Sequence, residues 1–155
     1  MDEVEAADLK TLALSRPPLT EAALLELMAY QRALADHPGA GSPDLAAAHQ
    51  AALEKTKLSP DEVDQWSGVV REYCGKRWTA GLLARRRQEL EARKAQGPLT
   101  PQDEAKLAGL LKEGARAGDL TAIERRYGAA AFALLEKHEA ALLALHERLR
   151  TLSCY

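Results

Sequence analysis

Leu58-Ser59-Pro60-Asp61-Glu62 is the stretch that decides the fold, because it carries several signals of a helix start at once. The Ser59 hydroxyl can accept a hydrogen bond from an otherwise unpaired amide of the first turn, and a proline at the first helical position loses no intrahelical hydrogen bond. Ser59 and Glu62 have the spacing of a capping box, and Leu58 and Val63 have that of a hydrophobic staple. The stretch therefore predicts a helix that begins at Pro60.

Two further stretches carry the same signature of an aliphatic residue, a hydroxyl residue and then acidic or helix-forming residues. They are Leu19-Thr20-Glu21 and Leu99-Thr100-Pro101-Gln102-Asp103. Carboxylates in the first turn face the positive end of the helix dipole, which stabilises the start. Because the residues between the three starts do not align with one another, we interpret the pattern as successive helix hairpins rather than as a tandem repeat.

The composition favours an all-α protein. Hydrophobic residues make up 46% of the 155 residues, and they are mainly Ala and Leu, which are strong helix formers. No window shows the period-two alternation of β-branched residues that predicts a strand. We expect a single domain over residues 1–155, with 1–18 as a loosely docked N-terminal segment, because a chain of this length can bury a core without metal or disulfide.

The helical segments together predict an elongated bundle of five to six helices. We expect the long helix 60–96 to change face or kink at Gly75 and Gly81, where its apolar stripe shifts phase. Residues 120–152 show a near-heptad stripe, which predicts a second long helix packed antiparallel against the first as a spine. The expected helices span residues 2–15, 21–36, 42–57, 60–96, 101–116 and 120–152.

The net charge of −2 argues neither for nor against a nucleic-acid or membrane partner. The charge is unevenly distributed, however, because Arg71 to Gly97 holds eight basic and three acidic residues. Such a segment is either a solvated helix face or a docking surface for a partner.

The candidate partner-binding residues lie in this basic segment. Trp, Tyr and Arg dominate binding hot spots, so we single out Arg77, Trp78 and the run Arg85, Arg86 and Arg87. On the expected helix, Trp78 points away from the face that Arg77 shares with Trp66 and Tyr73. The alternative interpretation is structural: Arg77 pairs with a carboxylate, and the arginine run pairs with Glu89 and Glu91 at helical spacing.

His138 is the candidate for a ligand site. It falls near the middle of the apolar stripe of the last predicted helix, and a buried imidazole must find a hydrogen-bond partner. It would line a cavity for a small ligand or haem together with Trp66 and Tyr73. The alternative is a core histidine satisfied by a neighbouring helix, with Trp66 and Tyr73 also in the core. We expect His146 to lie at the amphipathic surface.

Motifs for catalysis or metal binding are absent from the sequence. None of the histidines has an acidic residue three positions before it, and HExxH, Gly-x-Ser-x-Gly, P-loop and GxGxxG motifs are missing. Cys74 beside Lys76 and Arg77 could have a lowered pKa, but the sequence offers no evident partner histidine. We therefore predict no catalytic residues, no metal and no cofactor, and thus a protein that is not an enzyme.

The sequence favours a non-enzymatic protein–protein interaction or regulatory adaptor module with an unidentified protein partner or a second copy of itself. The alternatives are a bundle that binds a small ligand or haem, and a weak nucleic-acid binder that uses the basic half of the fourth helix. No apolar run approaches the roughly 20 residues of a membrane span. Cys74 and Cys154 lack CxxC spacing and are expected to be free thiols, which favours the cytoplasm; an exported protein without its signal would look the same.

Overall fold

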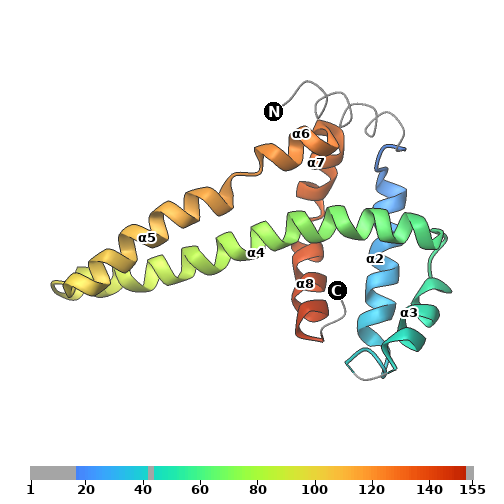
Figure 1. The fold of residues 1–155 in the computed structure, drawn as a ribbon, viewed down its shortest axis with the longest axis horizontal. Helices are drawn as coiled ribbons and strands as arrows, with labels where there is room; N and C mark the ends of the chain where they lie inside the picture. Colours follow the sequence, from blue (N-terminus) through green and yellow to red (C-terminus); the bar gives the residue numbers. More distant parts are fainter. Residues whose placement is uncertain (1–16, 42–43, 153–155) are drawn as a thin grey trace, which may run out of the picture.

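A computed structural model describes residues 17–41 and 44–152, and these residues are almost entirely helical (Figure 1). The prediction of an all-α protein is thus confirmed, and no strand occurs in the part of the chain described. The helix expected at 2–15 lies outside these residues. The helices are α2 (Glu21–Asp36), α3 (Leu45–Leu53), α4 (Pro60–Gln96), α5 (Pro101–Gly118), α6 (Thr121–Tyr127), α7 (Ala129–Lys137) and α8 (Glu139–Thr151).

The three predicted helix starts are confirmed by their capping contacts. The Ser59 hydroxyl accepts from the Glu62 amide at 3.2 Å, and the Glu62 carboxylate accepts from the Ser59 amide at 2.7 Å, which completes a capping box. The Thr20 hydroxyl caps α2 by accepting from the Ala23 amide at 3.1 Å, and the Thr100 hydroxyl caps α5 by accepting from the Asp103 amide at 3.2 Å. These contacts are local in sequence, so they form wherever the chain enters a helix.

The prediction of one long helix over 120–152 is wrong, because the chain divides there into α6, α7 and α8. Gly128 separates α6 from α7 with a φ of 92°, a left-handed conformation that glycine adopts without steric cost. His138 separates α7 from α8. The predicted antiparallel spine is therefore not confirmed: α5 lies along the second half of α4, whereas α8 crosses α4 steeply (Figure 1).

The molecule has two visibly different parts (Figure 1). The first half of α4 gathers with α2, α3 and α6 to α8 into a helical body, and the second half of α4 projects from it beside α5. We call this projection, residues 79–118, the helical arm. The body holds the main core, whose largest fully buried side chains include Leu24, Leu27, Leu34, Val70, Tyr73, Cys74, Ile123, Leu135, Leu142 and Leu149.

The predicted face change of α4 is confirmed, although the helix stays continuous through Gly75 and Gly81. Before these glycines, buried side chains such as Val63 and Val70 join the body core. After them, Leu83 and Leu90 are buried outside that core, toward α5. One helix thus serves two packing partners in succession.

Candidate functional site

The helical arm is closed by a short apolar seam. Leu83 and Leu90 of α4 and Leu107 of α5 are each less than one-tenth exposed. Leu83 and Leu90 are seven residues apart, a spacing that keeps both side chains on one face of a helix. This face explains why α4 packs against α5 after it leaves the body.

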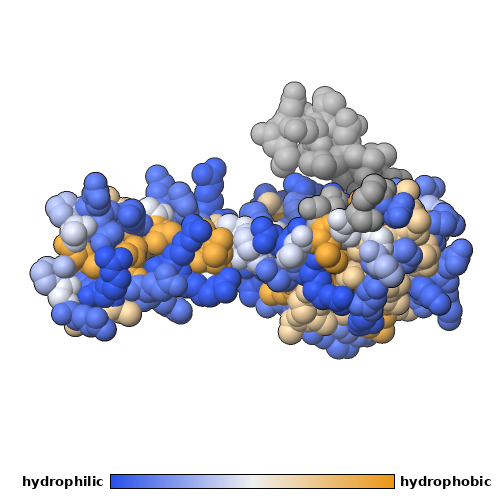
Figure 2. Space-filling model, turned by 90° about the horizontal axis from the view of Figure 1, so that it is seen from below, coloured by the Kyte–Doolittle hydropathy of each residue, from blue (hydrophilic) through white to orange (hydrophobic). Residues whose placement is uncertain are grey.

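The seam between α4 and α5 does not cover every apolar side chain of the arm, so some of them remain exposed to solvent. Leu111 is 49% exposed, and Leu82, Leu99 and Leu110 are half-buried. Figure 2 shows an orange apolar run along the arm between hydrophilic side chains. An exposed apolar row with a polar rim is typical of an interaction surface.

Charges at the tip of the arm neutralise one another. Arg93 and Lys106 both pair with Asp103, at 2.6 and 3.7 Å, and Lys94 pairs with Glu104 at 3.3 Å. Asp103 is buried, so its charge needs these partners. These three basic and two acidic side chains leave a net charge of only +1 at the tip.

Charges nearer the body are not neutralised in this way. Within the described residues, four basic side chains of the arm form no ion pair, whereas only two acidic ones are in the same position. Arg87 is not one of these four basic residues, because its Nε lies 3.7 Å from Glu91 Oε1 and forms an ion pair with it. The unpaired basic residues are Arg85, Arg86, Lys112 and Arg116, and the unpaired acidic residues are Glu89 and Glu113.

A shallow depression of about 380 Å³ lies between α4 and α5 where the arm meets the body. Gly75, Leu83 and Ala117 give it a mostly apolar wall, and the rest of its lining is Lys76, Thr79, Glu113 and Arg116. A Cβ added at Gly75 would meet no atom within 4 Å, so the depression is open above that residue. Lys76 Nζ donates to the Asp119 carbonyl oxygen at 2.9 Å. Hydrogen bonds from Thr121, together with the charge of Lys76, lower the pKa of the Asp119 carboxyl.

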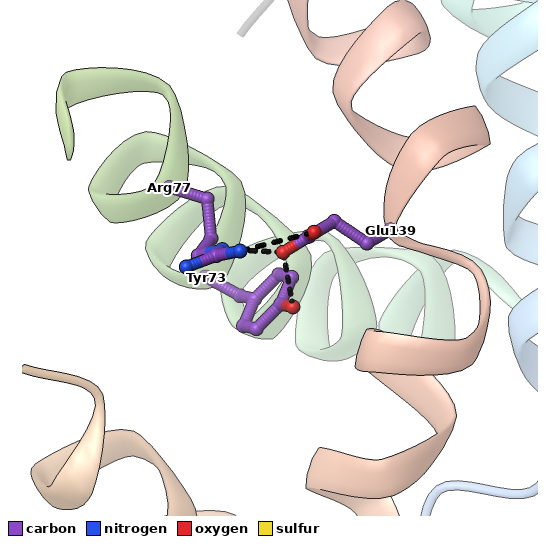
Figure 3. Close-up of polar contacts among 3 residues, drawn as sticks. All are labelled: Tyr73, Arg77 and Glu139. Carbon is purple, nitrogen blue, oxygen red and sulfur yellow. Dashed lines mark hydrogen bonds and ion pairs between the residues drawn. The ribbon is translucent and has the colours of Figure 1, made fainter. Parts of the chain in front are cut away.

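The candidate residue Arg77 lies away from this depression, in a contact between α4 and α8. Its Nη2 donates to Glu139 Oε2 at 3.1 Å, its Nε donates to Oε1, and the Tyr73 hydroxyl donates to Oε1 at 2.7 Å (Figure 3). The hydrogen bond from Arg77 holds the pKa of Glu139 below its usual value, against the opposing effect of burial. Burial and this carboxylate raise the pKa of Tyr73.

Trp78 also contacts α8. Its Nε1 donates to Glu147 Oε2 at 2.6 Å, and the guanidinium carbon of Arg150 lies 3.8 Å from the centre of its ring. The indole therefore has both a hydrogen-bond acceptor and a cation over one face within the chain.

The structure thus separates the candidate partner-binding residues into two groups. Arg77 and Trp78 join α4 to α8, whereas Arg85, Arg86 and Arg87 lie on the arm, about 12 Å farther along the helix at 1.5 Å per residue. Arg85 and Arg86 are exposed and Arg87 is half-buried.

The candidate ligand-binding residues are tied into the body. His138 Nε2 lies 2.9 Å from Glu21 Oε1, which also accepts from Lys137 Nζ at 2.6 Å. Trp66 and Tyr73 are buried in the core, and the Tyr73 ring meets Phe132 edge to face. A second depression, of about 330 Å³, is lined by Gln65, Gly68, Val69 and Tyr127. Neither depression is lined by His138, Trp66 or Tyr73.

Two residues behave differently from what the sequence indicated. His146, expected at the surface, is buried, and burial lowers its pKa, with the nearby Arg150 acting in the same direction. Cys74 is buried, and burial raises the pKa of its thiol to about 12. A thiol with this pKa stays protonated near neutral pH and is a poor nucleophile. The neighbouring Lys76 and Arg77 suggested a lowered pKa for this thiol. In the structure, Lys76 Nζ contacts the Asp119 carbonyl oxygen and Arg77 contacts Glu139 instead.

The part of the chain described contains no group of three or more His, Cys, Asp or Glu side chains placed to hold a metal ion. None of its helices is both long and apolar enough to cross a membrane. Comparisons with protein-family models, curated proteins and solved structures found no match to this chain.

Proposed function

We propose that this protein is a non-enzymatic protein–protein interaction module that presents the helical arm to a partner. The observation that carries the proposal is the apolar surface that the arm leaves outside its seam, where Leu111 is 49% exposed and Leu82 and Leu110 are half-buried. A third helix laid along the side of the arm that carries Leu82 and Leu110 would bury these two leucines, as in helix-in-groove recognition.

The division of the molecule supports this proposal. The body core includes α2, α3 and the first half of α4, and the seam of the arm lies outside it. The arm therefore extends its surface away from the body (Figure 1). Arg77 and Trp78 fit the same proposal as anchors of α4 on α8 that fix the direction in which the arm leaves the body.

Site-specific photo-crosslinking tests the proposal. A photoreactive residue at Leu82 or Leu111 is expected to capture one defined protein in the source cells, whereas the same residue at Leu25, an equally exposed leucine of the body, is not. The captured protein is then purified and mixed with the purified chain. A 1:1 complex supports the proposal; failure of every captured protein to bind, or equal capture at Leu25, contradicts it.

A nucleic-acid binder is the second candidate, favoured by the unpaired Arg85, Arg86 and Arg116. Binding through phosphates predicts that log K falls with log salt concentration with a slope of roughly −0.9 per phosphate neutralised. A titration of a labelled duplex over a range of salt concentrations distinguishes this candidate from a protein partner.

A further inference from the structure

We infer that the depression at the base of the arm docks the apolar face of an acidic amphipathic helix from a partner protein. The inference rests on the proposed function and adds which side of the arm is used and what the partner looks like. Its basis is the combination of an open apolar wall with a basic edge between α4 and α5.

The wall fits the side chains of a helix. Leu83 and Ala117 are apolar, and Gly75 contributes no side chain, so about 380 Å³ stays open between the two helices. Amphipathic helices insert side chains at i, i+3, i+4 and i+7 into grooves of this kind. Leu82 and Arg86 continue along α4 from Thr79, at steps of three and four residues, so a docked helix would extend from the depression toward the middle of the arm.

The charges around the depression select an acidic partner. Arg116 forms no ion pair within the described residues, whereas Lys76 donates to the Asp119 carbonyl oxygen and its charge acts on the carboxylate of the same residue. Arg86 and Lys112 stand unpaired farther along the arm, whereas Glu113 is the carboxylate at the depression. Complementary charge around an apolar contact speeds association and suppresses wrong partners.

A second copy of the arm fits less well. Residues 79–118 carry eight basic and five acidic side chains, so two arms laid together would bring like charges into contact. A nucleic acid would contact the arginines but would leave the apolar wall uncovered.

A designed peptide tests the inference directly on the full chain. The probe is a fluorescein-labelled helix of about 18 residues, or about five turns, with leucines on one face and glutamates elsewhere. We expect it to bind the protein by fluorescence anisotropy, with an affinity that falls as salt is added. A peptide in which lysines replace the glutamates is expected to bind at least about tenfold more weakly.

Gly75→Leu fills the depression and has a matched control in Gly81→Leu. Both glycines lie in α4, and an added Cβ meets no atom within 4 Å at either position, but Gly81 does not line the depression. Both substitutions favour the helix, so thermal unfolding is expected to stay cooperative. The affinity for the acidic peptide should fall about tenfold in Gly75→Leu and stay unchanged in Gly81→Leu.

The charge contribution has its own pair of variants. Arg116→Glu is expected to weaken peptide binding about tenfold, whereas Arg125→Glu, an exposed arginine of α6, is not. Equal affinity of the acidic and basic peptides, equal effects of Gly75→Leu and Gly81→Leu, or no peptide binding overturns the inference. A DNA duplex of similar length that displaces the peptide and binds Gly75→Leu normally would overturn it in favour of nucleic acid.

Failure of this inference is distinguishable from failure of the proposed function. If a purified partner found by crosslinking binds Gly75→Leu as tightly as the unaltered chain, the depression is not the docking site, but the interaction function stands. If no captured protein binds the purified chain, the proposed function fails.

Discussion

Glu139, the first residue of α8, accepts hydrogen bonds from Arg77 of α4, with Arg77 Nη2 and Glu139 Oε2 3.1 Å apart. The two residues are 62 positions apart in the sequence. Because Arg77 lies just before the arm begins, this contact fixes α4 on the body at the point where the helix leaves it (Figure 3).

Removing this carboxylate should destabilise the body. We expect Glu139→Gln to lower the free energy of unfolding by about 1–3 kcal/mol, because Arg77 and Tyr73 lose a charged acceptor at a partly buried site. Chemical denaturation followed by circular dichroism measures the effect. Glu124→Gln, which removes the charge of an exposed carboxylate of α6, is the control, and an equal loss in both variants would contradict the assignment.

The same contact predicts a loss of stability in acid. Arg77 lowers the pKa of Glu139 from its usual value of 4.5, so the contribution is complete above pH 4.5 and is lost as pH falls through the lowered pKa. The difference in stability between the unaltered chain and Glu139→Gln should shrink over that window. A difference that stays constant as the solution is acidified would show that the carboxylate contributes by packing alone.

His146 predicts a second pH dependence at higher pH. Burial lowers its pKa from the usual 6.5, so the unfolded chain takes up a proton before the folded one does as pH falls below 6.5. Stability should therefore decrease from pH 6.5 downward to the lowered pKa. Nuclear magnetic resonance titration of the imidazole checks the pKa directly, and a midpoint at or above 6.5 contradicts the prediction.

Gly128 is the glycine that the backbone requires. Its φ of 92° is unfavourable for a residue with a Cβ, so Gly128→Ala should destabilise the protein by about 1–2 kcal/mol even though no atom lies within 4 Å of the added Cβ. Gly109→Ala, inside α5 and equally open, should instead stabilise it by roughly 0.5–1 kcal/mol. Thermal unfolding of the two variants gives the signs.

Leu107 is expected to hold the arm closed without contributing to the body core. Leu107→Ala removes a buried seam residue and should accelerate amide hydrogen exchange in residues 79–118, while exchange in the body core is unchanged. Leu111→Ala, at an exposed position of the same helix, should have little effect on exchange. Faster exchange of the core amides in Leu107→Ala would show that arm and body unfold together.

The candidate site was only partly predictable. The basic segment and the Gly75 crossover were visible in the sequence, because charge and phase of an apolar stripe are properties of one helix. The depression was not visible, since α5 supplies Glu113, Arg116 and Ala117 to it. Trp78 illustrates the same limit, because its contacts with Glu147 and Arg150 come from α8.

The sequence by itself determined the all-α composition and the helix starts at Thr20, Ser59 and Thr100, since capping contacts reach only three residues along the chain. Only the tertiary structure decided where the final stretch breaks. Its apolar stripe is compatible with one continuous helix, but the body core takes up Ile123, Leu135 and Leu142 from three separate segments. Burial against distant helices decides that the chain bends at Gly128 and His138, although the amide and carbonyl of both residues still form i→i−4 hydrogen bonds. That burial comes from contacts that no local pattern contains.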